Sequence, residues 1–194
     1  MTPVRLRLLL LLLLIVSGAG AASAQAGYVV LARHAEKSGP TDTASLTPVG
    51  RQRATDLAAV LASTRLDAII STQYTRTRQT AAPIAAQMSI TPTIVDGGGR
   101  VMAHAADVAR TIDALASGSA VLVVGHSNTL GPIIAALGGP KLADLCDLEY
   151  STLLVLERPA PDAPWRFIRA RYGAPDPPGA DQCHASDGSM RPGR

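Results

Sequence analysis

The hydrophobic positions of this chain follow two alternating patterns. Short continuous apolar runs, typical of strands buried on both faces, alternate with longer segments whose apolar residues recur about every three to four positions, as in helices. The predicted strands comprise residues 28–31, 67–71, 91–95, 121–124, 152–156 and 166–170. The predicted helices begin at Thr47, near Arg76, at Ala105 and near Asn128. No helix separates the last two strands, and their proline-rich connection, residues 159–164, suggests a hairpin.

Two of the predicted helices carry specific signals. Thr47 supplies an N-cap and Pro48 occupies the first helical position, where its missing N–H costs nothing. In the second helix, Pro83 lacks the N–H that a helix interior needs, so we expect a kink or a restart there. The predicted apolar face of the first helix consists of Val49, Ala54, Leu57, Ala58 and Leu61.

This order of elements predicts an α/β fold. Strands that alternate with helices form a mostly parallel sheet covered by helices on both faces. The chain has 194 residues, of which 47% are hydrophobic but only 3% aromatic, so we expect one domain with an aliphatic core. We assign this domain to residues 27–174. Residues 175–194 are rich in Pro, Gly, Asp and Ser without periodicity, which predicts a disordered tail.

The first 26 residues have the pattern of a secretory signal peptide. Arg5 and Arg7 precede a leucine-rich stretch that ends in small residues, with cleavage expected after Ala24 or Ala26. An uncleaved membrane anchor is the alternative, because the stretch is almost long enough to span a bilayer. The glycine breaks favour cleavage, which predicts a periplasmic or secreted protein without stable membrane insertion.

Charge and cysteine content narrow the choice of partners. Removing Arg5 and Arg7 lowers the formal net charge from +3 to about +1, and aromatic stacking residues are scarce, so we expect no nucleic-acid partner. Cys146 and Cys183 can form a disulfide in an oxidising compartment. Two unpaired thiols are the alternative, which the spacing alone does not exclude.

The ends of three predicted strands carry the candidate chemistry. Arg33 and His34 follow the first strand, Arg76 lies shortly after the second, and His126 follows the strand at residues 121–124. In parallel sheets, ligands bind beyond the carboxyl ends of the strands, so these four side chains should converge. Burying so much positive charge is costly unless an anion occupies the site, and guanidinium groups match the oxygens of a phosphoryl group.

These residues predict covalent phosphoryl transfer. A neutral imidazole can attack phosphorus and carry the phosphoryl group, while the arginines and a protonated His126 stabilise its oxygens. We also expect backbone donors from a helix start near Ser127 and Asn128. The scheme requires no metal and no cofactor, and no cluster of Asp or Glu accompanies the two candidate histidines, so no metal site is expected.

Four sequence blocks resemble the histidine phosphatase (phosphoglycerate mutase-like) superfamily. Residues 31–36 (LARHAE) resemble its Arg-His-Gly signature, and residues 46–51 (LTPVGR) its Leu-Thr-Pro-x-Gly helix start. Residues 75–81 (TRTRQTA) resemble its Arg-x-x-Gln-Thr-Ala block, and residues 124–127 (VGHS) its second histidine block. The resemblance spans about residues 28–173, which is nearly the whole predicted domain.

The resemblance implies a fold and a role for each matched residue. The fold is a three-layer α/β/α sandwich with a mostly parallel sheet and an antiparallel edge. His34 is implied to be the nucleophile, with Arg33, Arg76 and His126 completing the phosphate pocket. The implied activity is phosphomonoester hydrolysis, and the short inserts resemble the compact branch of phosphohistidine phosphatases.

The chain also departs from the family pattern. Ala35 replaces the usual glycine, and the asparagine that many members carry soon after the signature is not evident between Lys37 and Ser45. No Glu occurs between Arg78 and His126 to protonate a leaving group. The carboxylates available there are Asp96, Asp107 and Asp113.

The remaining polar residues receive weaker assignments. We expect Arg78 and His104 to be structural or solvated, His184 to lie in the tail, and Glu36 and Lys37 to lie either at the pocket rim or on the surface. The predicted substrate is a phosphorylated small molecule or envelope component. A non-catalytic phosphate-binding module is the main alternative, and a mutase ranks lowest because no second basic cluster is present.

Overall fold

The computed structural model describes residues 27–159 and 163–180. The predicted signal peptide, Cys183 and His184 therefore lie outside the described residues. Within the described ranges, no helix has the length and apolar character needed to cross a membrane.

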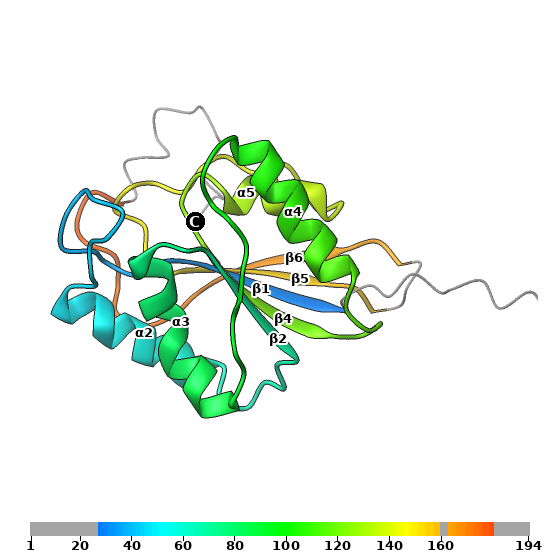
Figure 1. Cartoon of the computed structure of the whole chain (residues 1–194), viewed down its shortest axis with the longest axis horizontal. Helices are drawn as coiled ribbons and strands as arrows, with labels where there is room; N and C mark the ends of the chain where they lie inside the picture. The colour runs from blue at the N-terminus through cyan, green and yellow to red at the C-terminus, as the bar shows by residue number, and fades with distance from the viewer. Residues whose placement is uncertain (1–26, 160–162, 181–194) are drawn as a thin grey trace, which may run out of the picture.

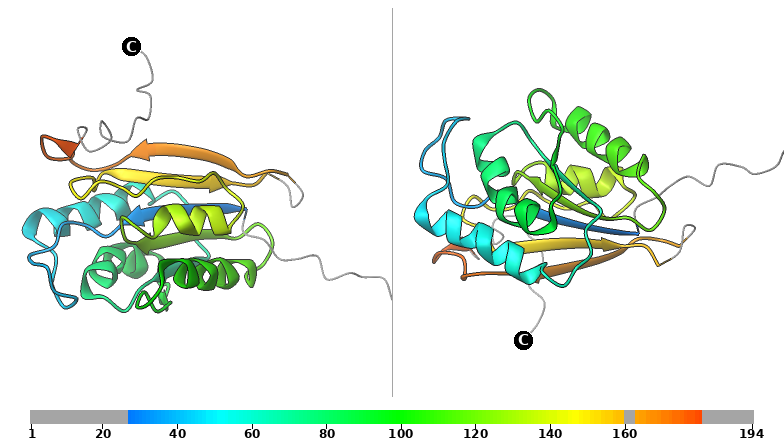
Figure 2. Two further views of the ribbon diagram at one scale, coloured as in Figure 1. Left: turned by 90° about the horizontal axis from the view of Figure 1, so that it is seen from above. Right: turned by 60° about the horizontal axis from the view of Figure 1, so that its bottom comes forward.

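A six-stranded mixed sheet forms the centre of the domain, with strand order β3-β2-β4-β1-β5-β6. Strands β3, β2, β4 and β1 are parallel, whereas β5 runs antiparallel to both of its neighbours. The predicted hairpin is therefore confirmed, and it forms one edge of the sheet (Figure 2). The strands are β1 (Tyr28–Arg33), β2 (Ala68–Ser71), β3 (Thr93–Ile94), β4 (Ala120–Gly125), β5 (Thr152–Glu157) and β6 (Arg166–Arg171).

Helices cover both faces of this sheet, which confirms the predicted α/β/α sandwich. Helices α2 and α3 lie together on one side and α4 and α5 on the other (Figure 1). The helices are α2 (Pro48–Val60), α3 (Thr75–Met88), α4 (Val101–Asp113) and α5 (Leu130–Ala136). Each helix pair covers an aliphatic core. Leu57 and Ile84 are fully buried on one side of the sheet, and Ile112 and Ile133 on the other.

Helix α2 begins as predicted, but its buried face is different. Thr47 is the N-cap and its Oγ1 accepts a hydrogen bond from the Gly50 N–H at 3.0 Å. Val49 was predicted to lie on the apolar face, yet it is 57% exposed. It points outward because Gly50 and Arg53 occupy the buried stripe of the helix together with the aliphatic residues.

The other helices differ from expectation mainly at their boundaries. Helix α3 continues through Pro83 as one helix, so the predicted restart is wrong. Helix α4 begins at Val101, four residues before the predicted start, and α5 begins at Leu130 rather than near Asn128. Helix α5 ends before Gly138, which adopts a left-handed φ of 86°.

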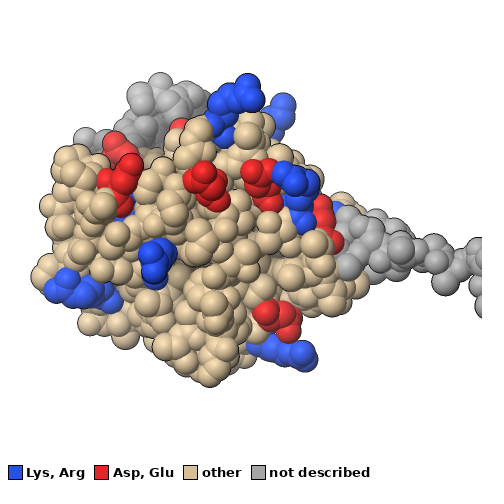
Figure 3. All heavy atoms as spheres, viewed as in Figure 1, with Lys and Arg blue, Asp and Glu red and all other residues tan. Residues whose placement is uncertain are grey.

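On the face shown in Figure 3, acidic and basic side chains are interspersed and separated by uncharged surface. This view contains no continuous basic patch. Three basic side chains, Arg33, Lys37 and Arg76, line a pocket at the carboxyl ends of the parallel strands.

Candidate active site

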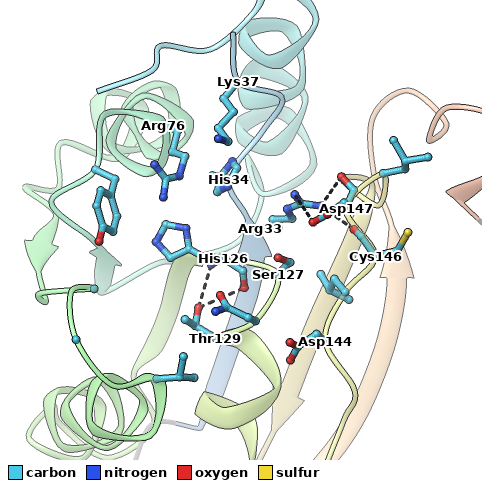
Figure 4. Close-up of a pocket in the computed structure, with 17 residues that line it drawn as sticks. Arg33, His34, Lys37, Arg76, His126, Ser127, Thr129, Asp144, Cys146 and Asp147 are labelled. Carbon is cyan, nitrogen blue, oxygen red and sulfur yellow. Dashed lines mark hydrogen bonds and ion pairs between the residues drawn. The ribbon is translucent and has the colours of Figure 1, made fainter. Parts of the chain in front are cut away.

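A pocket of about 780 Å³ opens beyond the carboxyl ends of β1 and β4 (Figure 4). Because β1 pairs in parallel with β4, and β4 with β2, the segments that follow these strands meet at one edge of the sheet. The four predicted site residues all line this pocket: Arg33, His34, Arg76 and His126. The structure thus shows that the four side chains lie in one pocket, and their catalytic roles remain a prediction.

His34 is buried and its ring is held in one orientation. Its Nδ1 lies 2.9 Å from the Ala35 carbonyl oxygen. Since a carbonyl only accepts, Nδ1 must carry the proton and Nε2 keeps its lone pair in the neutral ring. The ring centroid lies 5.4 Å from that of His126, with the rings edge to face. The nitrogen available for reaction is therefore Nε2.

Arg33 is held by the loop that precedes β5. Its Nη1 donates to the carbonyl oxygens of Cys146 at 2.7 Å, Asp147 at 3.0 Å and Glu149 at 3.1 Å. The guanidinium also lies over the ring of Tyr150, 4.2 Å from its centroid. In Figure 4, Arg33 lies with Cys146 and Asp147, on the opposite side of the pocket from Arg76 and Lys37.

Arg76 has two buried donors, Nε and Nη1, that make no hydrogen bond within the described residues, although Nη1 forms an ion pair. Its side chain is 11% exposed, lies over Tyr74 at 4.4 Å, and has Asp42 at 3.6 Å from Nη1. Buried guanidinium N–H groups without acceptors are costly, so this geometry suits a site that normally holds an anion.

His126 lies between the ends of β2 and β4. Its Nε2 shares a hydrogen bond with Thr72 Oγ1 at 3.2 Å, and its backbone N–H donates to Thr129 Oγ1 at 3.0 Å. Ser127 and Asn128 line the pocket as predicted, but they precede α5 rather than open it. This helix has only seven residues, so we assign no anion site to its N-terminus.

Burial in the pocket keeps both histidines neutral. Burial, reinforced by the charges of Arg33, Arg76 and Lys37, lowers the pKa of His34 to about 3. Burial, together with His34 and Arg76, likewise lowers the pKa of His126 to about 3. A neutral His34 is the form that can act as a nucleophile.

Helix α3 also fixes the turn that carries His34. The Ala35 N–H donates to Thr80 Oγ1 at 2.9 Å, and the Thr80 hydroxyl donates to the Arg76 carbonyl at 2.7 Å. One turn of α3 therefore links Arg76 to the residue that follows His34. Thr80 belongs to the third sequence block, and that membership was the signal that could have identified it.

Glu36 faces away from the pocket and forms a buried ion pair. Both of its carboxylate oxygens accept from Arg53 at 2.8–3.0 Å, and the Arg53 side chain is 2% exposed. Glu36 and Lys37 were both predicted to lie either at the pocket rim or on the surface. Lys37 lines the pocket, whereas Glu36 anchors the turn to α2.

The carboxylates that line the pocket differ from those considered in the sequence. Asp96 accepts from Gln73 and lies outside the pocket lining, and Asp107 pairs with Arg110 on the surface of α4. Asp144 and Asp147, from the loop before β5, do line the pocket. These two residues lie outside the four sequence blocks, so no motif identified them.

Other sequence assignments have mixed outcomes. His104 lies inside α4 and is buried, with its Nδ1 donating to the Asp96 carbonyl at 2.8 Å, and Arg78 is exposed. Tyr74 and Tyr150, which flank the two arginines, had no sequence signal. Among the described residues, no cluster of three or more His, Cys, Asp or Glu could hold a metal ion.

Cys146 is disulfide-bonded, and it belongs to the loop that holds Arg33. Its predicted partner, Cys183, lies outside the described residues.

A family model supports the sequence resemblance. The model of the histidine phosphatase superfamily (branch 1) matches residues 29–98. That range contains Arg33, His34 and Arg76, whereas His126 lies beyond it. No curated protein sequence matches the chain significantly.

Solved structures share the fold across nearly their whole length. A protein assigned as phosphohistidine phosphatase SixA from Nakamurella multipartitia is 25% identical, with 78% of this chain and 99% of that chain covered and a TM-score of 0.57. The protein with the same assignment from Agrobacterium tumefaciens is also 25% identical, with 77% and 99% covered and a TM-score of 0.56. A mycobacterial glucosyl-3-phosphoglycerate phosphatase, solved with inorganic phosphate, shares the fold at 16% identity, with 77% and 98% covered and a TM-score of 0.58.

Proposed function

Because this chain belongs to the histidine phosphatase superfamily, we propose that it hydrolyses phosphomonoesters through a phosphohistidine intermediate on His34. The family and the SixA-type relatives support a phosphatase activity. The observation that carries the phosphohistidine proposal is the orientation of His34. Its unprotonated Nε2 shares one pocket with buried Arg76 donors that make no hydrogen bond within the described residues.

The proposed reaction has two steps. His34 Nε2 attacks phosphorus, a P–N bond forms, and the ester P–O bond breaks with its electron pair leaving on the alcohol oxygen. Water then attacks the phosphohistidine, releases inorganic phosphate and restores the imidazole. The cations of the pocket stabilise the equatorial oxygens in both steps, which is the main contribution expected in phosphoryl transfer. No metal is required by this scheme.

His126 is proposed to gain a proton when the phosphoryl group binds. Its pKa is about 3, so it is neutral at pH 7. A phosphate dianion beside the ring favours the charged imidazolium and raises that pKa. Binding and proton uptake are therefore coupled in the proposed mechanism.

The pocket favours substrates whose leaving groups need little protonation. Residues 97–101, which follow β3, contribute Gly97, Gly99 and Val101 to the lining but no acid. Asp144 and Asp147 are the described carboxylates that line the pocket, and they lie beyond Ser127 or beside Arg33 rather than next to His34 (Figure 4). We therefore expect aryl phosphates to be hydrolysed faster than alkyl phosphates.

We also propose that the enzyme acts after export, on a phosphorylated small molecule or envelope component. The signal-peptide pattern of residues 1–26 supports this location. Detection of the mature form, lacking these residues, in a periplasmic or culture fraction would support export. Its exclusive recovery from the cytoplasm would contradict it.

The deciding experiment measures hydrolysis of para-nitrophenyl phosphate by mature wild type and His34→Ala. We expect the variant to lose at least about a thousandfold in kcat, because the nucleophile is absent. Rapid quench with a labelled ester should trap an acid-labile phosphoryl group on wild type and none on His34→Ala.

Folded wild type that binds phosphate but releases none from any ester would instead support the non-catalytic binding module. Equal activity in His34→Ala would contradict the phosphohistidine route. Arg78→Ala is the matched control, because Arg78 is exposed on α3 and lies outside this pocket.

A further inference from the structure

Lys37 adds a positive charge to the pocket, although it belongs to none of the four sequence blocks. It lies three residues after His34, is partly buried and lines the pocket. Figure 4 shows its side chain beside His34 and Arg76. Its charge also contributes to the lowered pKa of His34, which agrees with this proximity.

The ammonium group has no counter-ion in the described part of the chain. Its Nζ donates to the Gly39 carbonyl at 2.7 Å, which leaves two of its three donors for other acceptors. The nearby carboxylate of Asp42 lies instead on Arg76. A partly desolvated cation among other cations is costly unless an anion joins them.

Arg33 lies away from the side of the pocket that Lys37 and Arg76 occupy. Its Nη1 already donates to three backbone carbonyls of residues 146–149, and Figure 4 places it opposite Arg76. The cationic side chains that flank the two histidines on the other side are therefore Arg76 and Lys37. A phosphoryl group on His34 would face both.

The fold holds Lys37 and Arg76 in a fixed relation. Lys37 forms a β-bridge with Leu46, and the Leu46 N–H donates to Gln79 Oε1 at 2.7 Å. Gln79 lies on α3, one turn after Arg76. The same helix thus positions the backbone of both residues before a ligand arrives.

We propose that Lys37 is a substrate-binding residue that donates, together with Arg76, to the non-bridging oxygens of the phosphoryl group. This inference rests on the proposed function, since it assigns a further ligand to the same site. As a compact charge, Lys37 attracts the phosphoryl dianion in the substrate and in the transition state alike. It therefore contributes to phosphate affinity as well as to kcat/KM.

The chain offers a matched control, because its other lysine, Lys141, is exposed and does not line the pocket. Binding of inorganic phosphate and hydrolysis of para-nitrophenyl phosphate are measured for mature wild type, Lys37→Gln, Lys37→Arg and Lys141→Gln. We expect Lys37→Gln to weaken phosphate binding and kcat/KM by about tenfold or more, as for loss of a charged hydrogen bond. Lys37→Arg should recover part of this loss, and Lys141→Gln should match wild type.

The acid limb of the kcat/KM profile provides a readout that a purely structural role would not move. Lys37→Gln removes a positive neighbour of His34, so this limb should shift to higher pH, whereas Lys37→Arg should leave it in place. Equal phosphate affinity in Lys37→Gln and wild type would overturn the assignment of Lys37 alone. Absence of phosphate binding in folded wild type would overturn both this assignment and the proposed function. Melting curves without phosphate check that each variant is folded.

Discussion

The hydrogen bond from His34 Nδ1 to the Ala35 carbonyl determines which ring nitrogen can react. It fixes the tautomer, and the Ala35 N–H is itself held by Thr80. The side chain is thus oriented by backbone atoms and by α3 rather than by a carboxylate. The ring is therefore oriented without a carboxylate partner among the described residues, although Asp144 and Asp147 line the same pocket.

Arg76 and Arg78 should respond very differently to truncation. Arg76→Ala removes a guanidinium whose buried Nε and Nη1 make no hydrogen bond within the described residues, and we expect kcat/KM to fall by about a hundredfold to a thousandfold. Arg78→Ala should stay within about twofold of wild type, because the side chain is exposed on the same helix and contributes only surface charge. Steady-state assays with an aryl phosphate measure both. Similar losses in the two variants would argue against a specific role for Arg76.

The two buried histidines predict a pH-dependent stability. Their folded-state pKa values of about 3 lie below the ordinary value of 6.5, so the unfolded chain binds more protons between these limits. The free energy of unfolding should therefore be highest above pH 6.5 and decrease on acidification, by up to about 1.4 kcal/mol per pH unit for each histidine. Urea unfolding at pH 7.5, 6.5, 5.5 and 4.5, in a buffer without phosphate, measures the slope.

His126→Asn should flatten this slope, since it removes one of the two titrating groups. Asp176, whose lowered pKa arises despite burial from hydrogen bonds with Ser151 and Tyr150, loses its contribution only as the pH falls below about 4. It therefore does not interfere in the range tested. Identical slopes in wild type and His126→Asn would contradict a neutral, buried His126.

Helix α2 supports the turn after β1, which carries His34, by direct backbone contact. Gly50, in its first turn, packs against Glu36, two residues after His34. Arg53, one turn later, binds the Glu36 carboxylate and also donates to the Ala174 carbonyl at 2.9 Å. The helix thereby joins the turn after β1 to the segment after β6.

Gly50→Ala should therefore damage both stability and activity. A Cβ at this position would lie 2.2 Å from the Glu36 carbonyl oxygen, so the backbone must move. We expect the free energy of unfolding to fall by about 2–3 kcal/mol, as for overpacking, and kcat/KM to fall with it. Gly39→Ala is the control, because a Cβ there would contact nothing within 4 Å. Urea unfolding and aryl phosphate hydrolysis test both variants, and a neutral Gly50→Ala would contradict this packing.

In the domain as a whole, the chain returns after β6 to the loop that holds Arg33. The Asp176 carboxylate accepts hydrogen bonds from the backbone N–H groups of Tyr150 at 2.8 Å and Ser151 at 2.7 Å, and from the Ser151 hydroxyl at 2.7 Å. Tyr150 in turn lies against Arg33 and faces His34. Although Asp176 belongs to the segment predicted to be a disordered tail, it contacts the loop beside the pocket.

Asp176→Ala tests whether this return supports the site. Loss of a carboxylate that satisfies two backbone N–H groups should lower the free energy of unfolding by about 2 kcal/mol and raise KM for aryl phosphates. Asp113→Ala, at the exposed end of α4, should remain within about 0.5 kcal/mol of wild type. An Asp176→Ala variant as stable as Asp113→Ala would show that residues 174–180 contribute little.

Much of this protein follows from local patterns in its sequence. The apolar runs define β1 and β4, Thr47 and Pro48 mark the start of α2, and strand polarity brings His34 and His126 to one edge of the sheet. Each of these features depends on residues close in sequence, because hydrophobic periodicity and helix capping are local properties. The sequence by itself therefore determined the fold class and the residue types that form the pocket.

Only the tertiary structure decided how those residues are partnered. Arg33 and the Cys146 carbonyl lie 113 positions apart, yet their contact turns the guanidinium toward the loop before β5. The same folding selects Asp144 and Asp147 for the lining, leaves Asp96 outside it, and directs Lys37 into the pocket. Such contacts depend on how distant segments pack, and the burial that results is what lowers the histidine pKa values.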